Sequence, residues 1–189
     1  MAFNKGNIEK QILLIPKEVK WCKRCVVSNQ RPRTRFNIDG ICSACQWAYE
    51  KDHVIDWEKR EKELIQLLDQ HRSKDGSWDV IVPSSGGKDS GYVAHQLRHE
   101  YGMNPLTVTW APLSYTDIGR ANLDANINSG LSNLLCTPNG KFQRKLARLC
   151  LEELGDAFHV FVLGQVYFPF HMALKFGIKL VFYGENGGL

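Results

Sequence analysis

The chain has 189 residues, a hydrophobic content of 43%, a net charge of +4 at pH 7 and six cysteines. This length accommodates one good-sized domain and a small module, and the hydrophobic share excludes a disordered or fibrous protein. No apolar run reaches the roughly 18 residues that span a bilayer, and the first ten residues lack the apolar core of a signal peptide. We therefore expect a cytoplasmic protein that does not enter a membrane.

Two Cys-x-x-Cys pairs, Cys22 with Cys25 and Cys42 with Cys45, are separated by 16 residues. This spacing is typical of a tetrahedral zinc site with four thiolate ligands. Because four protein ligands leave no open position for a catalytic water, we expect a structural zinc that supplies folding energy to a module over residues 1–55. The alternative is a knot of two disulfides, which a reducing cytoplasm disfavours.

The excess positive charge lies near these cysteines, since residues 1–77 carry 15 Lys+Arg against 11 Asp+Glu while residues 78–189 carry 9 of each. Seven cations between Lys17 and Arg35 face one carboxylate, that of Glu18. Such a cluster is typical of a surface that contacts phosphates of a nucleic acid or a nucleotide sugar, or of a solvated face around a metal site. For four large apolar residues we expect a miniature core rather than stacking platforms for bases: Trp21, Phe36, Ile41 and Trp47.

Beyond the module, Asp56 is a predicted N-cap, and apolar residues at helical spacing predict an amphipathic helix over 57–72. The polar break at 73–77 then separates a connecting segment, 56–77, from a domain over 78–189. In that domain the pattern predicts strands at about 78–83, 105–110, 131–136 and 179–183, and helices at about 89–100, 140–154 and 165–176. This alternation indicates an α/β fold with a parallel sheet.

A glycine-rich loop follows the first of these strands, and its eight residues read Pro83, Ser84, Ser85, Gly86, Gly87, Lys88, Asp89 and Ser90. Two adjacent glycines allow backbone N–H groups to turn toward an anion, and the following helix adds its positive end. Lys88 supplies a cation, and Asp89 a magnesium ligand. The loop does not meet the Walker A pattern. The alternative is a plain turn.

Other candidate site residues follow the later strands, because ligands collect at the carboxyl ends of parallel strands. After the second strand come Thr109, Trp110 and Ala111, and after the fourth come Glu185 and Asn186. The last two either hold magnesium or substrate or form a simple polar turn. Two further residues, Cys136 and Cys150, are expected to be buried apolar side chains, with a catalytic or cluster-binding role as the alternative.

The loop resembles the SGGxDS motif of the ATP pyrophosphatase (PP-loop) superfamily, whose members cut ATP between the α and β phosphates. This resemblance implies an adenine nucleotide alpha hydrolase-like (Rossmann-like) sheet with helices on both faces. Six segments together resemble the N-acetyl sugar amidotransferase family of bacterial lipopolysaccharide and nonulosonic-acid pathways. They are 22–25, 31–36, 40–45, 55–60, 83–90 and 183–186.

The family resemblance implies that ATP adenylylates the N-acetyl oxygen of a nucleotide-linked sugar and that ammonia then displaces AMP to leave an acetamidino group. It further implies that the loop binds the β and γ phosphates with Mg²⁺, that Lys88 neutralises the α phosphate, and that the backbone around Trp110 contacts adenine. Ammonia would come from a separate glutaminase pair. Members of that family are about twice as long, so we expect this chain either to lack a C-terminal part or to have its site completed by a second chain. In both cases we expect it to be weakly active or inactive alone. An exposed sheet edge leads us to expect self-association.

Two other functions remain open at this point. One is a tRNA-thiolating or otherwise tRNA-modifying ATP pyrophosphatase, although Cys136 and Cys150 do not match the cysteine pair that such enzymes carry. The other is a non-catalytic zinc and nucleotide-binding protein.

Overall fold

The structure is a computed structural model that describes residues 16–185. The chain divides into two compact units, Met1–Arg60 and Glu61–Leu189. The division falls inside one helix, α3 (Trp57–His71), between the boundaries expected at residues 55 and 77. Each unit is described by itself below.

The first unit consists of loops around the cysteine pairs, followed by helix α2 (Ser43–His53) and the start of α3. Two asparagine side chains fix the loops. Asn29 donates from Nδ2 to the Glu18 carbonyl at 2.9 Å, and Asn37 Oδ1 accepts from the Ile41 amide at 2.8 Å. Asparagine suits such positions because its short side chain bonds nearby backbone groups. The sequence did not predict α2, which buries none of its residues.

The second unit is built on a parallel three-stranded sheet of β1 (Val80–Pro83), β2 (Pro105–Trp110) and β3 (Ser132–Cys136) in the order β1-β2-β3. The three predicted strands are thus present, with ends shifted by up to two residues. The strand predicted at 179–183 is not formed as a strand, because Val181 makes only an isolated parallel bridge to Ile81. That bridge places the segment beside β1, on the edge opposite β2.

Besides the larger part of α3, the described residues of the second unit form four α-helices and one π-helical turn: α4 (Lys88–His95), the π-helical turn η1 (Gln96–Glu100), α5 (Asp117–Asn128), α6 (Gly140–Leu154) and α7 (His159–Phe176). The helices predicted at 89–100 and 140–154 are confirmed, the first as α4 with η1. Helix α7 begins six residues before the predicted start at 165. Helix α5 was not predicted.

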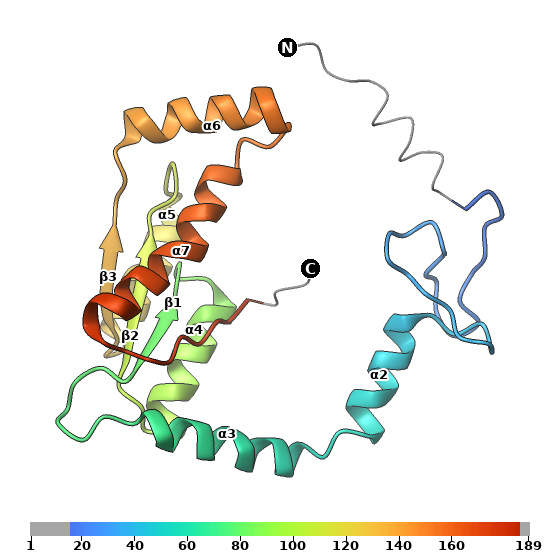
Figure 1. The fold of residues 1–189 in the computed structure, drawn as a ribbon, viewed down its shortest axis with the longest axis horizontal. Helices are drawn as coiled ribbons and strands as arrows, with labels where there is room; N and C mark the ends of the chain where they lie inside the picture. The colour runs from blue at the N-terminus through green and yellow to red at the C-terminus, as the bar shows by residue number, and fades with distance from the viewer. Residues whose placement is uncertain (1–15, 186–189) are drawn as a thin grey trace. The chain divides into compact units, whose positions relative to one another are not determined.

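Helices cover both faces of the sheet (Figure 1). On one face, Val80 and Val82 pack with buried residues of α3 and α4, including Leu68 and Ala94. On the other face, Ile81 and two residues of β2 pack with α7. The alternation of neighbouring side chains between faces explains why β1 is apolar throughout, as in a strand covered on both sides. The second unit is therefore an α/β layer structure, as the sequence indicates.

Helix α7 contains Pro169, which is buried. Proline has no N–H, so the carbonyl of Gln165 lacks its ordinary helical donor at this point. Among the described residues, no single helix is long and apolar enough to cross a membrane. Within residues 16–185, one pair of helices, α6 and α7, passes such a test when taken together, on length and composition, and the two are bent by 118° at the break between them.

Candidate functional site

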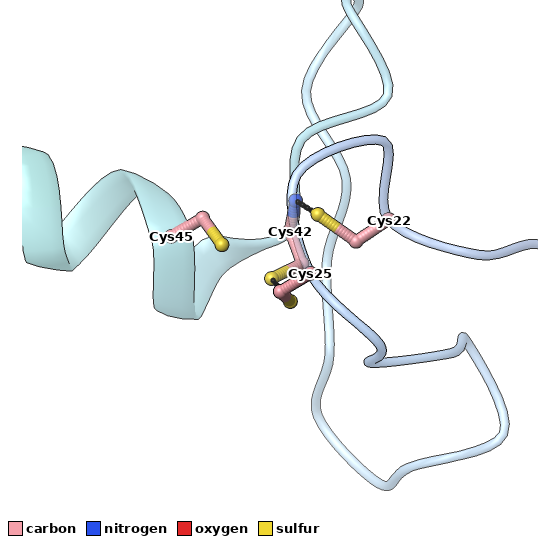
Figure 2. A group of neighbouring side chains, drawn as sticks. All are labelled: Cys22, Cys25, Cys42 and Cys45. Carbon is pink, nitrogen blue, oxygen red and sulfur yellow. Dashed lines mark hydrogen bonds between the residues drawn. The ribbon is translucent and has the colours of Figure 1, made fainter.

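The first unit brings all four predicted metal ligands together. The Sγ atoms of the four cysteines lie within 4.8 Å of one another, and Figure 2 shows the side chains converging. Cys22 and Cys42 are buried, whereas Cys25 and Cys45 are partly exposed. All four are free, and Cys25 Sγ lies 3.6 Å from Cys42 Sγ, so the cluster is not the disulfide knot considered above. Four converging thiols could hold a metal ion such as zinc.

Backbone donors polarise this cluster. The amides of Cys42 and Arg24 donate to Cys22 Sγ at 3.2 and 3.3 Å. Burial alone would raise the pKa of Cys22, but these donors outweigh it and lower that pKa to about 6. Hydrogen bonding to Cys25, followed by burial, raises the pKa of Cys45 to about 12. At neutral pH a thiolate and a thiol therefore share the metal-free cluster, and a metal ion would displace the thiol proton.

The expected miniature core is wrong for two of its four residues. Trp21 is 62% exposed and Trp47 is 52% exposed, while Phe36 and Ile41 are partly buried. The sulfur cluster fills the centre instead, with Cys42 fully buried. A module held by a metal cluster does not need its aromatic side chains as a core.

In the second unit, the glycine-rich loop joins β1 to α4. Gly86 has a φ of +85°, in the left-handed region that favours glycine. A Cβ at this position would lie 2.7 Å from the backbone nitrogen of Leu123 in α5. The loop therefore requires glycine here for two reasons, its backbone conformation and the close approach of α5.

Hydrogen bonds of buried hydroxyl groups fix the start of the loop to the neighbouring strand β2. Ser84 and Ser90 are buried, with their Oγ atoms 3.3 Å apart. Thr109 Oγ1 donates to the Ser84 carbonyl at 2.5 Å, and Asn133 Nδ2 donates to Thr109 Oγ1 at 2.9 Å. Thr109 thus supports the loop with its side chain. The role of Asn133 in supporting the loop was not predicted from the sequence. The available signal was its polar side chain inside a predicted strand.

A cavity of about 570 Å³ opens beside the loop, at the carboxyl ends of β1 and β2. Its polar end is formed by Ser84, Ser85, Ser90 and Glu185. Most of the remaining lining is apolar, from the strands and from α7: Pro83, Val108, Trp110, Val162, Gln165, Val166, Pro169, Phe170 and Tyr183. This volume and this mixture of lining are typical of a small-molecule site.

Trp110 forms part of the cavity wall and packs against α7. Its ring centroid lies 5.7 Å from that of Phe168. The indole Nε1 is buried and has no hydrogen-bond partner among the described residues. A Cβ on Gly164 would overlap the indole, so the glycine lets the helix approach the ring.

The segment after Val181 closes the cavity over the loop. Tyr183 donates from its hydroxyl to the Val166 carbonyl at 3.0 Å, and burial raises the pKa of this tyrosine. A Cβ on Gly184 would lie 2.9 Å from the carbonyl carbon and oxygen of Asp89. Glu185 lies at the cavity, whereas Asn186 lies outside the described residues.

The remaining predicted site residues lie apart from the cavity wall. Lys88 and Asp89 form an ion pair of 3.8 Å with side chains 91% and 62% exposed. Thr109 and Ala111 are buried and do not line the cavity. Cys136 is half-buried rather than fully buried, and so is the second such cysteine, Cys150.

A comparison with models of protein families finds no match, and a comparison with curated proteins finds none either. The functional conclusions therefore depend on the geometry of the two sites and on the motifs.

Proposed function

We propose that the chain is an ATP-dependent amidotransferase that binds ATP in the cavity beside the glycine-rich loop. One observation carries this proposal: the loop forms the polar end of an otherwise apolar cavity at the carboxyl ends of parallel strands. The cavity lies where β1 is flanked by β2 on one side and by the Val181 bridge on the other. In doubly wound sheets ligands bind at such a point, which supports an adenine nucleotide alpha hydrolase-like fold.

The two ends of the cavity suit the two ends of a nucleotide. Ser84, Ser85 and Ser90 of the loop line the cavity, and the Ser85 hydroxyl would donate to phosphate oxygens there. Helix α4 begins at Lys88, and its N-terminus would also favour an anion. The apolar wall of Trp110, Val166 and Phe170 suits a purine base. Lys88 is exposed and would leave its ion pair with Asp89 to reach the α phosphate. Asp89 and Glu185 are the carboxylates that would hold Mg²⁺, and the ion would neutralise phosphate charge.

The proposed reaction transfers AMP to an amide oxygen of an N-acetyl group on a nucleotide-linked sugar. The amide oxygen attacks the α phosphorus, the bond to the β phosphate breaks, and pyrophosphate leaves. Ammonia, from a separate glutaminase pair, then attacks the activated carbon. AMP departs with the former amide oxygen, one proton is released, and an acetamidino group remains. The residues of the cavity would act by positioning and electrostatics rather than as a nucleophile.

Calorimetry with ATP and Mg²⁺ tests the binding part of this proposal. We expect Lys88→Ala to weaken ATP binding by roughly 10- to 100-fold, since a hydrogen bond to a charged group contributes about 1.5–3 kcal/mol. Lys141→Ala is the matched control, because Lys141 is an exposed lysine near the start of a different helix, α6. ATP binding that is absent, or equal in both variants, would overturn the proposal. With nucleotide sugar and ammonium present, products of ADP and phosphate in place of AMP and pyrophosphate would overturn the reaction.

A further inference from the structure

The first unit carries a short, strongly basic surface. Seven exposed cations lie between residues 17 and 35 and face a single carboxylate, that of Glu18: Lys17, Lys20, Lys23, Arg24, Arg31, Arg33 and Arg35. From residue 36 to the end of the unit at Arg60, five carboxylates outnumber three cations, which are Lys51, Lys59 and Arg60. Among the described residues of the unit, the net positive charge is therefore concentrated in the stretch 17–35, and the residues after it carry a net negative charge.

The arginines of this stretch are available for a ligand. In the part of the chain that the structure describes, the one ion pair within residues 17–35 joins Lys20 to Glu18 at 3.4 Å. The guanidinium groups of Arg31, Arg33 and Arg35 make no ion pair with a described residue, and all three residues are exposed. A guanidinium group binds phosphate through two parallel N–H donors.

The backbone holds two of these arginines in a tight turn. The Arg31 amide donates to the Ser28 carbonyl and the Thr34 amide donates to the Arg31 carbonyl, both at 3.3 Å. Within this turn Arg33 has a φ of +64°, the one positive φ among the described non-glycine residues. Such a conformation costs about 1–2 kcal/mol for a residue with a Cβ, and strain of this kind clusters at ligand sites.

An exposed aromatic ring lies on the strand-like segment beside this turn. Trp21 forms an antiparallel bridge with Ser28, three residues before Arg31, and its side chain is 62% exposed. An indole ring in this position offers a stacking face for a nucleobase. The bridge thus places the segment that carries this exposed ring three residues from the start of the arginine turn.

We propose that this arginine turn surface, defined as Trp21, Arg31, Arg33 and Arg35, binds the nucleoside diphosphate part of the nucleotide-linked substrate. The base stacks on Trp21, and the two phosphates are held by guanidinium groups. The narrow extent of the positive charge favours this short anion over a nucleic-acid strand. The inference rests on the proposed function only for the identity of the substrate, because the surface lies in a different unit from the ATP cavity.

Calorimetric titration of the full chain with UDP, CDP and GDP in turn tests the inference. We expect at least one of them to bind, and we expect Arg31→Ala with Arg33→Ala to weaken that binding by roughly 100-fold or more. Trp21→Ala should weaken it by about 5- to 150-fold, and Trp21→Phe should restore most of the affinity. The double substitution Lys141→Ala with Lys145→Ala in α6 is the control for a loss of two positive charges, and it should leave diphosphate binding unchanged. Retained metal content shows that each variant has kept the first unit folded.

Three outcomes would overturn the inference. The first is that no diphosphate binds to the parent chain. The second is that diphosphate binding is lost on replacing Lys88 and kept on replacing the arginines. The third is that a single-stranded RNA 20-mer binds far more tightly than any diphosphate, with an affinity that falls steeply with salt. ATP titrations of the same arginine variants separate this inference from the proposed function. Unchanged ATP binding with lost diphosphate binding supports both, whereas arginine-dependent diphosphate binding without any ATP binding supports this inference and overturns the ATP cavity.

Discussion

Replacing Gly86 by alanine should damage the glycine-rich loop more than the backbone conformation alone explains. The φ of +85° costs alanine about 1–2 kcal/mol. The added Cβ would also lie 2.7 Å from the backbone nitrogen and 2.9 Å from the Cα of Leu123. Because neither backbone atom can rotate away, as the end of a flexible side chain could, the overlap adds about 1–3 kcal/mol. We therefore expect a total loss of about 2–5 kcal/mol in the free energy of unfolding.

Gly76→Ala is a matched control for this substitution. Gly76 has a φ of +81°, and a Cβ there would have no atom within 4 Å. It should lose only the conformational part, about 1–2 kcal/mol. Urea unfolding of the two variants measures the difference, and ATP titration should show weaker binding for Gly86→Ala alone. Equal losses of stability in the two variants would refute the close approach between the loop and α5.

Gly164→Ala should push the Trp110 indole toward the cavity, lowering stability by about 1–3 kcal/mol and weakening ATP binding, and an unchanged melting temperature would argue against that contact. Cys42→Ser should abolish binding of one zinc ion per chain, measured by elemental analysis, while Cys136→Ser keeps it; equal metal content in both would contradict the four-thiol site. Because the pKa of Cys45 is raised to about 12, zinc binding at pH 7 should release its proton, and zinc affinity should rise with pH. Calorimetry in buffers of different ionisation enthalpy measures this release, and a value of zero would refute it.

The sequence predicts the strands of the second unit better than its helices. Strand β1 is a short apolar run bounded by polar residues, so its pattern is unambiguous. Helix α5 was missed because Leu123, Ala125 and Ile127 alternate with polar residues, which is the period of a strand rather than of a helix. Its available signal was local: Thr116 caps the helix by accepting from the Gly119 amide at 3.1 Å.

The four-thiol cluster could be predicted from the sequence, whereas the exposure of Trp21 and the shape of the cavity could not. Cysteine spacing predicts the four-thiol cluster because the ligands themselves carry the information. Nothing local to Trp21 reveals that it lies on the surface, since its burial depends on whether metal ligands or aromatic rings fill the centre. The cavity depends on α7, whose wall residues are distant in sequence from the loop. Its apolar run beginning at Val160 lacks the amphipathic pattern that would have set the start of this helix.

Pro169 has a mechanical consequence for the cavity wall. The helix lacks one backbone hydrogen bond at Gln165, in the part of α7 that lines the cavity. A helix bends at the least cost where a proline removes such a bond, so this is the part of the cavity wall where α7 resists bending least. The Tyr183 hydroxyl donates to the next carbonyl of α7, that of Val166, and so ties this part of the helix to the segment after Val181. The residues of α7 around Gln165 and Pro169 thus combine two properties: they line the cavity, and they are joined by one backbone hydrogen bond fewer than the rest of the helix.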